Sequence, residues 1–200
     1  TMSEILESLF GSKERARLLR FFLQNPDQEY TYLEIARRNM LRGNIKREIE
    51  NLKKIKFILR RSKKGSISYV LNQNFSFYPE LKNLIAKSNV YPQCKSIANI
   101  GKIGNVKLAA ISGVFINYEK GKADMIIVGD DISRGRLKNL MASLEAEIGK
   151  EIDFVLMSGD EFKYRLNMLD KFILDFLEGP HEEVINKLTW LKRFIATKRK

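Results

Sequence analysis

The sequence contains few of the residues on which disulfide-bonded, zinc-binding and membrane proteins depend. Cys94 is the only cysteine among the 200 residues, and His181 is the only histidine. A single cysteine permits no internal disulfide and no zinc site built from several cysteines. No apolar run approaches the roughly 18 residues of a membrane-spanning helix, and the N-terminus lacks a charged-then-apolar leader. We therefore expect a cytoplasmic protein that does not associate with a membrane.

The composition is that of a folded chain with an excess of positive charge. Hydrophobic residues make up 44% and charged residues 30% of the chain, proportions that exclude collagen-like, low-complexity and wholly disordered proteins. The length suits one large domain or two small ones. The 36 basic and 24 acidic side chains give a net charge of +12, which favours a polyanionic partner.

The excess positive charge is concentrated in the first third of the chain. Residues 1–73 contain 16 basic and 8 acidic side chains, a net charge of +8. Residues 74–105 have a net charge of +3, whereas residues 106–191 have −4, and five basic side chains follow in the last nine residues. We therefore expect the first third to bind the polyanion and the last half to have another role.

The first third begins with the pattern of three helices. Ser12 can cap a helix that runs to about residue 23, and Thr31 with Glu34 forms a capping-box pattern that begins a short second helix. A third helix follows, because four apolar residues recur at helical spacing and form one face. These four residues are Ile45, Ile49, Leu52 and Ile55.

Residues 57–61 and 67–71 then indicate two strands, joined by a turn that contains glycine and two lysines. Three helices followed by a basic hairpin is the order of a winged helix-turn-helix. In that fold the third helix lies in the major groove and the hairpin lies along phosphates. We therefore predict a DNA-binding domain over residues 2–73. The residues predicted to contact DNA are Thr31, Arg42, Asn44, Lys46, Arg47, Asn51, Lys54, Arg61, Lys63 and Lys64.

Residues 74–105 are predicted to form a connector with a short helix at residues 80–87, whose Leu81, Leu84 and Ile85 side chains point inward. Residues 106–200 then alternate strands with helices, which predicts an α/β domain with a small mixed sheet and makes the whole protein α+β. The strands are expected at 106–116, 123–128 and 152–157. A helix over 132–149 would be capped by Asp130 or Asp131, and further helices, one of them starting at His181, would follow from Ser158 to the C-terminus.

Segments along nearly the whole chain resemble prokaryotic proteins in which a winged helix is fused to a polymerase-beta-like minimal nucleotidyltransferase domain. These segments are Leu9 to Lys13, Phe77 to Leu81, Ile127 to Asp130, Gly149 to Asp153 and Ser158 to Phe162. The resemblance implies a Gly-Ser pair that grips a triphosphate, an Asp-x-Asp that holds magnesium, and a third carboxylate.

This chain departs from that catalytic pattern. Ser112 and Gly113 occupy the position of the Gly-Ser pair in the reverse order, and Lys122 replaces the first aspartate, so that only Asp124 remains. Asp153 matches the third carboxylate. One or two carboxylates beside a lysine make a poor magnesium site, and Lys122 could pair with Asp124 in place of the metal. We therefore expect no enzymatic activity, no metal and no cofactor, with Asp124 and Asp153 as remnants.

The sequence thus favours a transcriptional regulator that binds double-stranded DNA as a homodimer, since helix-turn-helix proteins usually read two half-sites. Its second domain would serve assembly or the sensing of a small-molecule or protein effector. One alternative is an active, metal-dependent nucleotidyltransferase that uses Asp124 and Asp153. Another is an antitoxin-like module whose second domain binds a partner protein.

Overall fold

The protein divides into two compact units, which are described separately. The computed structural model describes residues 2–41, 45–63, 65–87, 94–118, 120–191 and 193–194. The first unit comprises the chain up to Cys94 together with Ala142–Glu151, and the second comprises Lys95–Met141 and the chain from Ile152 onward. Both units contain helices and a small sheet, so the fold is α+β, as the sequence predicts. None of the helices within the described residues is long and apolar enough to cross a bilayer.

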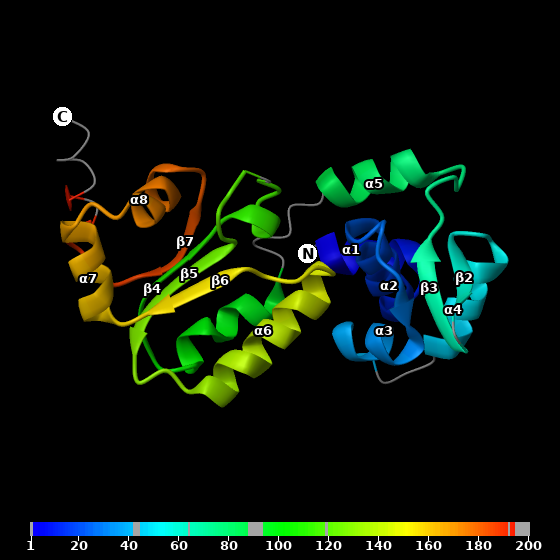
Figure 1. Ribbon diagram of the computed structural model, residues 1–200, viewed down its shortest axis with the longest axis horizontal. Helices are drawn as coiled ribbons and strands as arrows, with labels where there is room; N and C mark the ends of the chain where they lie inside the picture. The colour runs from blue at the N-terminus through cyan, green and yellow to red at the C-terminus, as the bar shows by residue number, and fades with distance from the viewer. Residues whose placement is uncertain are drawn as a thin grey trace. The chain divides into compact units, whose positions relative to one another are not determined.

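The first unit consists of helices around a three-stranded antiparallel sheet in the order β1-β3-β2 (Figure 1). Its elements are α1 (Met2–Phe10), α2 (Lys13–Gln24), β1 (Tyr30–Thr31), α3 (Tyr32–Arg38), α4 (Ile45–Lys54), β2 (Ile58–Lys63), β3 (Ser66–Leu71) and α5 (Tyr78–Lys87). The end of α6 (Arg134–Ile148) also belongs to this unit. The connector predicted over residues 74–105 is divided, because α5 belongs to the first unit and residues from Lys95 onward belong to the second.

Local capping interactions begin two of these helices as the sequence predicts. The Ser12 hydroxyl accepts a hydrogen bond from the Arg15 amide at 3.2 Å at the start of α2. At the start of α3, the Thr31 hydroxyl accepts from the Glu34 amide at 3.4 Å, while the Thr31 amide donates to the Glu34 carboxylate at 2.7 Å. This reciprocal pair is a capping box and satisfies two amides that lack a partner inside the helix.

The core of the first unit is formed by the apolar faces of α2 and α4 with the adjacent strands. Ile45, Ile49 and Leu52 are buried, which confirms most of the predicted apolar face of α4. The prediction for Ile55 is wrong: α4 ends at Lys54, and the Ile55 side chain is 57% exposed. On α5 the prediction is likewise correct for Ile85, which is buried, and wrong for Leu84, which is 37% exposed.

Cys94 is buried in the first unit, and this burial raises the pKa of its thiol to about 12. The thiolate is the nucleophile in alkylation, so a raised pKa lowers reactivity. We expect iodoacetamide at neutral pH to modify Cys94 at least about a hundredfold more slowly in the native protein than in urea-unfolded protein. Intact mass spectrometry reports this site alone, since the chain has no other cysteine. Equal rates in the two states would contradict the burial.

The second unit is built on a mixed four-stranded sheet in the order β6-β5-β4-β7. Its elements are η1 (Lys95–Lys102), β4 (Asn105–Ile111), η2 (Gly113–Phe115), β5 (Met125–Asp130), the first part of α6, β6 (Phe154–Met157), α7 (Gly159–Asn167), α8 (Lys171–Glu178) and β7 (Glu182–Asn186). Strands β5 and β6 run parallel, and β4 is antiparallel to both β5 and β7. The predicted small mixed sheet is therefore present.

Helices cover both faces of this sheet (Figure 1). On one face, Leu108 of β4 and Ile126 and Val128 of β5 pack with Phe162 of α7 and Ile173 of α8. Residues on β4 and β5 that point the other way, such as Ala109 and Ile127, are also fully buried. Figure 1 places η1 and the first part of α6 against this second face. Burial on both faces explains why β5 has a continuous apolar run rather than an alternating pattern.

The structure corrects two predictions in this unit, one for the end of β4 and one for the residue that caps α6. β4 ends at Ile111 rather than at residue 116, because Gly113 begins the short helix η2. Neither Asp130 nor Asp131 caps α6; the Ser133 hydroxyl accepts from the Arg136 amide at 3.4 Å instead. Asp130 forms an ion pair with Lys107 on β4 and accepts a hydrogen bond from the Gly159 amide.

The chain after α8 also differs from the prediction of helices to the C-terminus. Helix α8 ends before Gly179 and Pro180, and the following residues form β7, which pairs with β4. His181 therefore precedes a strand and does not begin a helix. Its Nδ1 atom lies 2.9 Å from the Gly179 carbonyl oxygen. The segment forms a strand because its backbone groups form hydrogen bonds with β4, a partner that is distant in the sequence.

Candidate functional site

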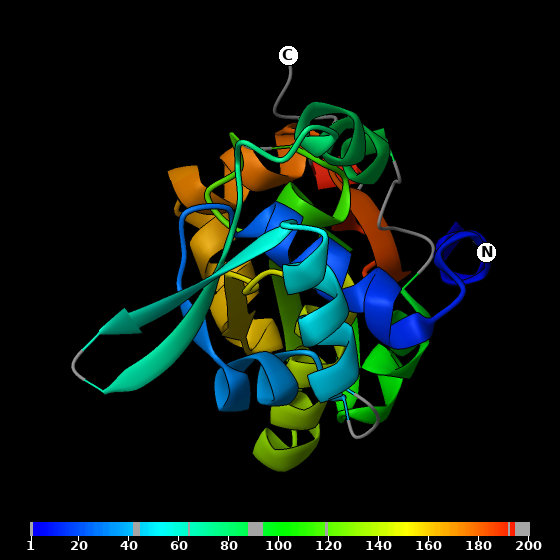
Figure 2. The same cartoon turned by 90° about the vertical axis from the view of Figure 1, so that its right-hand side faces the viewer.

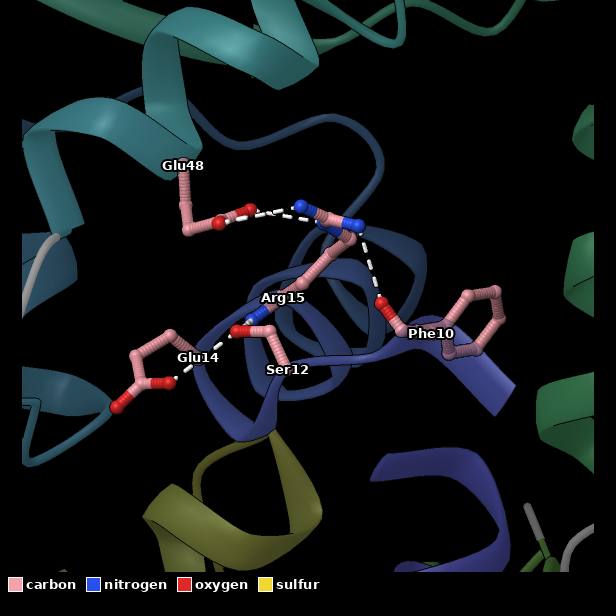
Figure 3. A network of polar contacts seen from close by, with 5 residues as sticks. All are labelled: Phe10, Ser12, Glu14, Arg15 and Glu48. Atoms are coloured by element: carbon pink, nitrogen blue, oxygen red, sulfur yellow. Dashed lines mark hydrogen bonds and ion pairs between the residues drawn. The ribbon is translucent and has the colours of Figure 1, made fainter. Parts of the chain in front are cut away.

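An ion pair holds α4 against α2 (Figure 3). The Glu48 carboxylate lies on the buried side of α4 and accepts hydrogen bonds from Arg15 Nε at 2.8 Å and Nη2 at 3.2 Å. Arg15 Nη1 also donates to the Phe10 carbonyl oxygen at 3.0 Å, and the hydrogen bond to Glu48 raises the pKa of the guanidinium. A bidentate pair of this kind fixes the orientation of α4 relative to α2 as well as the distance between them. The opposite side of α4 therefore has a defined orientation within the unit.

The opposite side of α4 is basic. Arg47, Asn51 and Lys54 follow one another at intervals of four and three residues and therefore share one face of the helix. Lys46, Arg47 and Lys54 are exposed, and Asn51 is half-buried. Among the described residues, no other side chain or backbone group forms a hydrogen bond or an ion pair with these four side chains. Their donors are therefore available to a ligand.

The β2–β3 hairpin adds a second group of cations. Arg61 and Lys63 alternate along β2 and lie on the same face of the hairpin, opposite Ser68 and Ser66 on β3. Both basic side chains are exposed and have no polar partner among the described residues. Gly65, with a φ of +80°, provides the left-handed backbone of the turn. Figure 2 shows that the hairpin extends away from α3 and α4 of its unit.

The remaining residues predicted to contact DNA have different positions. The Thr31 hydroxyl is engaged in the capping box of α3 and donates to Glu34 at 2.8 Å. Arg42, Asn44 and Lys64 lie outside the described residues. Sequence reasoning missed Lys56 and Arg60, which are exposed and have no polar partner within the described chain. The run of basic residues from Lys53 to Arg61 in the sequence could have predicted both residues as candidates for DNA contacts.

Four arginines of the first unit form hydrogen bonds or ion pairs with other residues of the unit. Their guanidinium groups are therefore less available to a ligand than those of the unpaired basic side chains. In addition to Arg15, Arg17 Nη1 donates to the Asn39 carbonyl oxygen at 3.0 Å, and Arg20 Nη1 donates to the Glu147 carbonyl oxygen at 2.6 Å. Arg38 forms an ion pair with Glu151 at 2.6 Å. Seven exposed cations of this unit without a polar partner among the described residues lie on α4, on the following turn and on the hairpin, while others, such as Lys13 and Arg37, lie on α2 and α3. We call this set of residues the cationic face: Lys46, Arg47, Lys54, Lys56, Arg60, Arg61 and Lys63.

The carboxylate of Asp124, the remaining aspartate of the Asp-x-Asp position, is bound to backbone amides. Asp124 Oδ1 accepts a hydrogen bond from the Val114 amide and Oδ2 accepts one from the Asp153 amide, both at 2.9 Å. Both carboxylate oxygens are therefore engaged by backbone. The Asp153 side chain is exposed. Within the described part of the chain, no group of three or more His, Cys, Asp or Glu residues could hold a metal ion.

Lys122 does not pair with Asp124, contrary to the sequence-based hypothesis. Its ammonium group lies 3.0 Å from Asp175 Oδ2 on α8. Asp124 instead holds the start of β5 to the loop after β4 and to the residue before β6, because its carboxylate bonds to Val114 and Asp153. The Asp124 amide also donates to the Asp153 carbonyl oxygen at 2.7 Å. In this arrangement Asp124 is a structural residue.

Comparison with known proteins assigns no family. No family model matches the chain, and no solved structure matches it. A stretch of 82 residues, 41% of the chain, is 35% identical to ABC transporter B family member 24, mitochondrial, from Arabidopsis thaliana. This stretch spans only 12% of the length of that protein, so the similarity does not establish shared membership of a family.

Proposed function

We propose that the protein is a DNA-binding transcriptional regulator whose first unit is a winged helix-turn-helix. The observation that carries the proposal is the cationic face: exposed basic side chains without polar partners, gathered on one helix and an extended hairpin. An unpaired cation on a protein surface attracts phosphate without first having to give up an ion pair. The order α2, α3, α4, β2 and β3 supports the winged helix-turn-helix.

In the proposed complex, α4 lies in the major groove, which is wide enough to admit a helix. Arg47 would donate to guanine O6 and N7, and Asn51 would pair with adenine N6 and N7, because these side chains match those edges. Lys46, Lys54 and the hairpin would contact phosphates. The Arg15–Glu48 pair would hold α4 at the angle that the groove requires.

The protein would bind DNA as a homodimer, since helix-turn-helix domains usually read two half-sites about one helical turn apart. Strands β4, β5 and β6 bring Ser112, Asp124 and Asp153 to one end of the second sheet, which agrees with a nucleotidyltransferase-like domain. Because both oxygens of Asp124 are bound to backbone amides, this domain would serve assembly or effector sensing rather than catalysis.

The proposal that the second domain does not catalyse nucleotide transfer can be tested directly. With labelled ATP, GTP, CTP or UTP and Mg²⁺ or Mn²⁺, we expect no incorporation of nucleotide into protein, nucleic acid or small molecules, because both oxygens of Asp124 are held by backbone amides and Lys122 replaces its partner carboxylate. Incorporation measured by scintillation counting, dependent on the metal and abolished by Asp153→Asn, would contradict the proposal.

The hairpin can be tested separately from sequence recognition. Lys63→Ala is expected to weaken binding to every duplex alike and to reduce the slope of log K against log salt by about one unit for each phosphate contact that is lost. Lys138→Ala is the matched control: Lys138 is an exposed lysine on the second unit's part of α6, and its loss changes the net charge equally. Equal effects of the two substitutions in a fluorescence-anisotropy titration would show that only net charge matters.

A further inference from the structure

The second unit contains a cavity of about 400 Å³ beside α8. The loop before β5 contributes Tyr118, Lys120 and Lys122 to its lining, and α8 contributes Asp175, Phe176 and Glu178; we call these two sets of residues its walls. We call it the dipolar pocket. Its volume lies in the range of pockets that enclose small molecules, roughly 300–1,000 Å³. It is not the carboxylate pair of Asp124 and Asp153, neither of which lines it.

Among the described residues, the charges that line the dipolar pocket are divided between its two walls. The loop before β5 contributes two ammonium groups, from Lys120 and Lys122, and α8 contributes two carboxylates, from Asp175 and Glu178. One ion pair, between Lys122 Nζ and Asp175 Oδ2 at 3.0 Å, connects the walls. Lys120 and Glu178 are exposed and have no polar partner among the described residues. Exposed Lys–Asp pairs contribute little to stability, so a ligand can displace this one at low cost.

The uncharged lining of the pocket includes two aromatic residues, Tyr118 and Phe176. Phe176 is 8% exposed, and its ring stacks at a tilt against His181 with centroids 6.0 Å apart, while Tyr118 lies on the opposite wall. The Ser112 hydroxyl, which also lines the pocket, already donates to the Pro180 carbonyl oxygen at 2.7 Å. The four charged side chains therefore provide the charged groups for recognition in this pocket, and the two rings supply an apolar surface.

We propose that the dipolar pocket binds a free α-amino acid with an apolar side chain. The carboxylate of the ligand would accept from Lys120 and Lys122, and its ammonium group would donate to Asp175 and Glu178. Its side chain would lie against Phe176 and Tyr118. A simple anion would meet the two carboxylates of α8, and a simple cation would meet the two lysines, whereas a zwitterion is complementary to both walls. This inference is independent of the proposed DNA binding.

The first test compares a ligand with two analogues that each lack one charge. Isothermal titration of the 200-residue chain with L-phenylalanine or L-leucine is expected to show saturable binding below about 10 mM, the weak end of small-ligand affinities. L-phenylalaninamide, which lacks the carboxylate, and 3-phenylpropanoate, which lacks the ammonium group, should each bind at least about tenfold more weakly. Binding of neither amino acid, or equal binding of the analogues, would overturn the proposal. Binding of inorganic phosphate or ATP in place of the amino acids would also overturn it, as it would indicate an anion site.

The second test uses the ion pair that connects the walls. Lys122→Gln and Asp175→Asn are each expected to weaken L-phenylalanine binding about tenfold or more. Lys107→Gln is the matched control, because Lys107 and Asp130 form a second, partly exposed Lys–Asp pair at the other end of β4 and β5. Thermal melts should be nearly unchanged for Lys122→Gln and Asp175→Asn, since their side chains are 58% and 44% exposed. Unchanged affinity in these two variants, or an equal loss in Lys107→Gln, would contradict the assigned site.

Discussion

The affinity of the protein for duplex DNA should fall by about 10³–10⁵-fold between 50 and 200 mM salt, if a dimer makes about 6–10 phosphate contacts. The reason is that each basic side chain that neutralises a phosphate releases condensed counterions, and this release is less favourable in a concentrated salt solution. The cationic face provides seven such side chains in each protomer within the described residues.

Fluorescence anisotropy with a labelled duplex at four or more salt concentrations measures this dependence. The steep slope is expected on random DNA as well as on a preferred sequence, because phosphates carry no sequence information. A loss of affinity smaller than tenfold across this range would show that the cationic face does not lie along the phosphates.

Gly113→Ala should strongly destabilise the second unit. The φ of Gly113 is +51°, a conformation that costs an L-residue about 1–2 kcal/mol. A Cβ atom at this position would also overlap the Asp124 carboxylate, and forcing an extra methyl group into a packed site typically costs about 1–3 kcal/mol. The displaced Asp124 would lose its hydrogen bonds to the Val114 and Asp153 amides. The unfolding free energy should therefore fall by about 2–5 kcal/mol, the sum of these contributions.

Urea unfolding followed by circular dichroism measures this loss. Gly135→Ala is the matched control, because Gly135 lies in α6 with open space around its position and no left-handed backbone. Alanine is the better helix former, so this control should stabilise the protein by up to about 1 kcal/mol. If Gly113→Ala were as stable as Gly135→Ala, Asp124 would not be held as described.

Interactions between neighbours in the sequence were predictable, and interactions between distant segments were not. The caps at Ser12 and Thr31 join residues three apart, so the local pattern was sufficient to place α2 and α3. Strand β7 exists because it pairs with β4, and its Glu182 lies opposite Ile111. Nothing in the local sequence after Pro180 indicated that pairing, and helices were predicted there.

The same distinction applies to the candidate sites. Counting charges located the basic third of the chain, and helical spacing placed Arg47 and Asn51 on the exposed side of α4. The sequence could not show that Arg15 is bound to Glu48, 33 residues away, or that Arg20 is bound to the Glu147 carbonyl oxygen. It also could not show that Lys122 turns to Asp175 on α8 rather than to Asp124. Each of these depends on packing between elements.

The proposal that α4 reads DNA is tested most directly by titrating Arg47→Ala and Asn51→Ala against a selected duplex and a random duplex, at two salt concentrations. Each substitution should cost about 1–3 kcal/mol on the selected sequence and little on random DNA, because hydrogen bonds to base edges are lost. Lys63→Ala should instead weaken both duplexes alike, and Lys138→Ala should weaken neither. If Arg47→Ala and Asn51→Ala bound both duplexes as tightly as the unsubstituted protein, α4 would not be the element that reads the sequence.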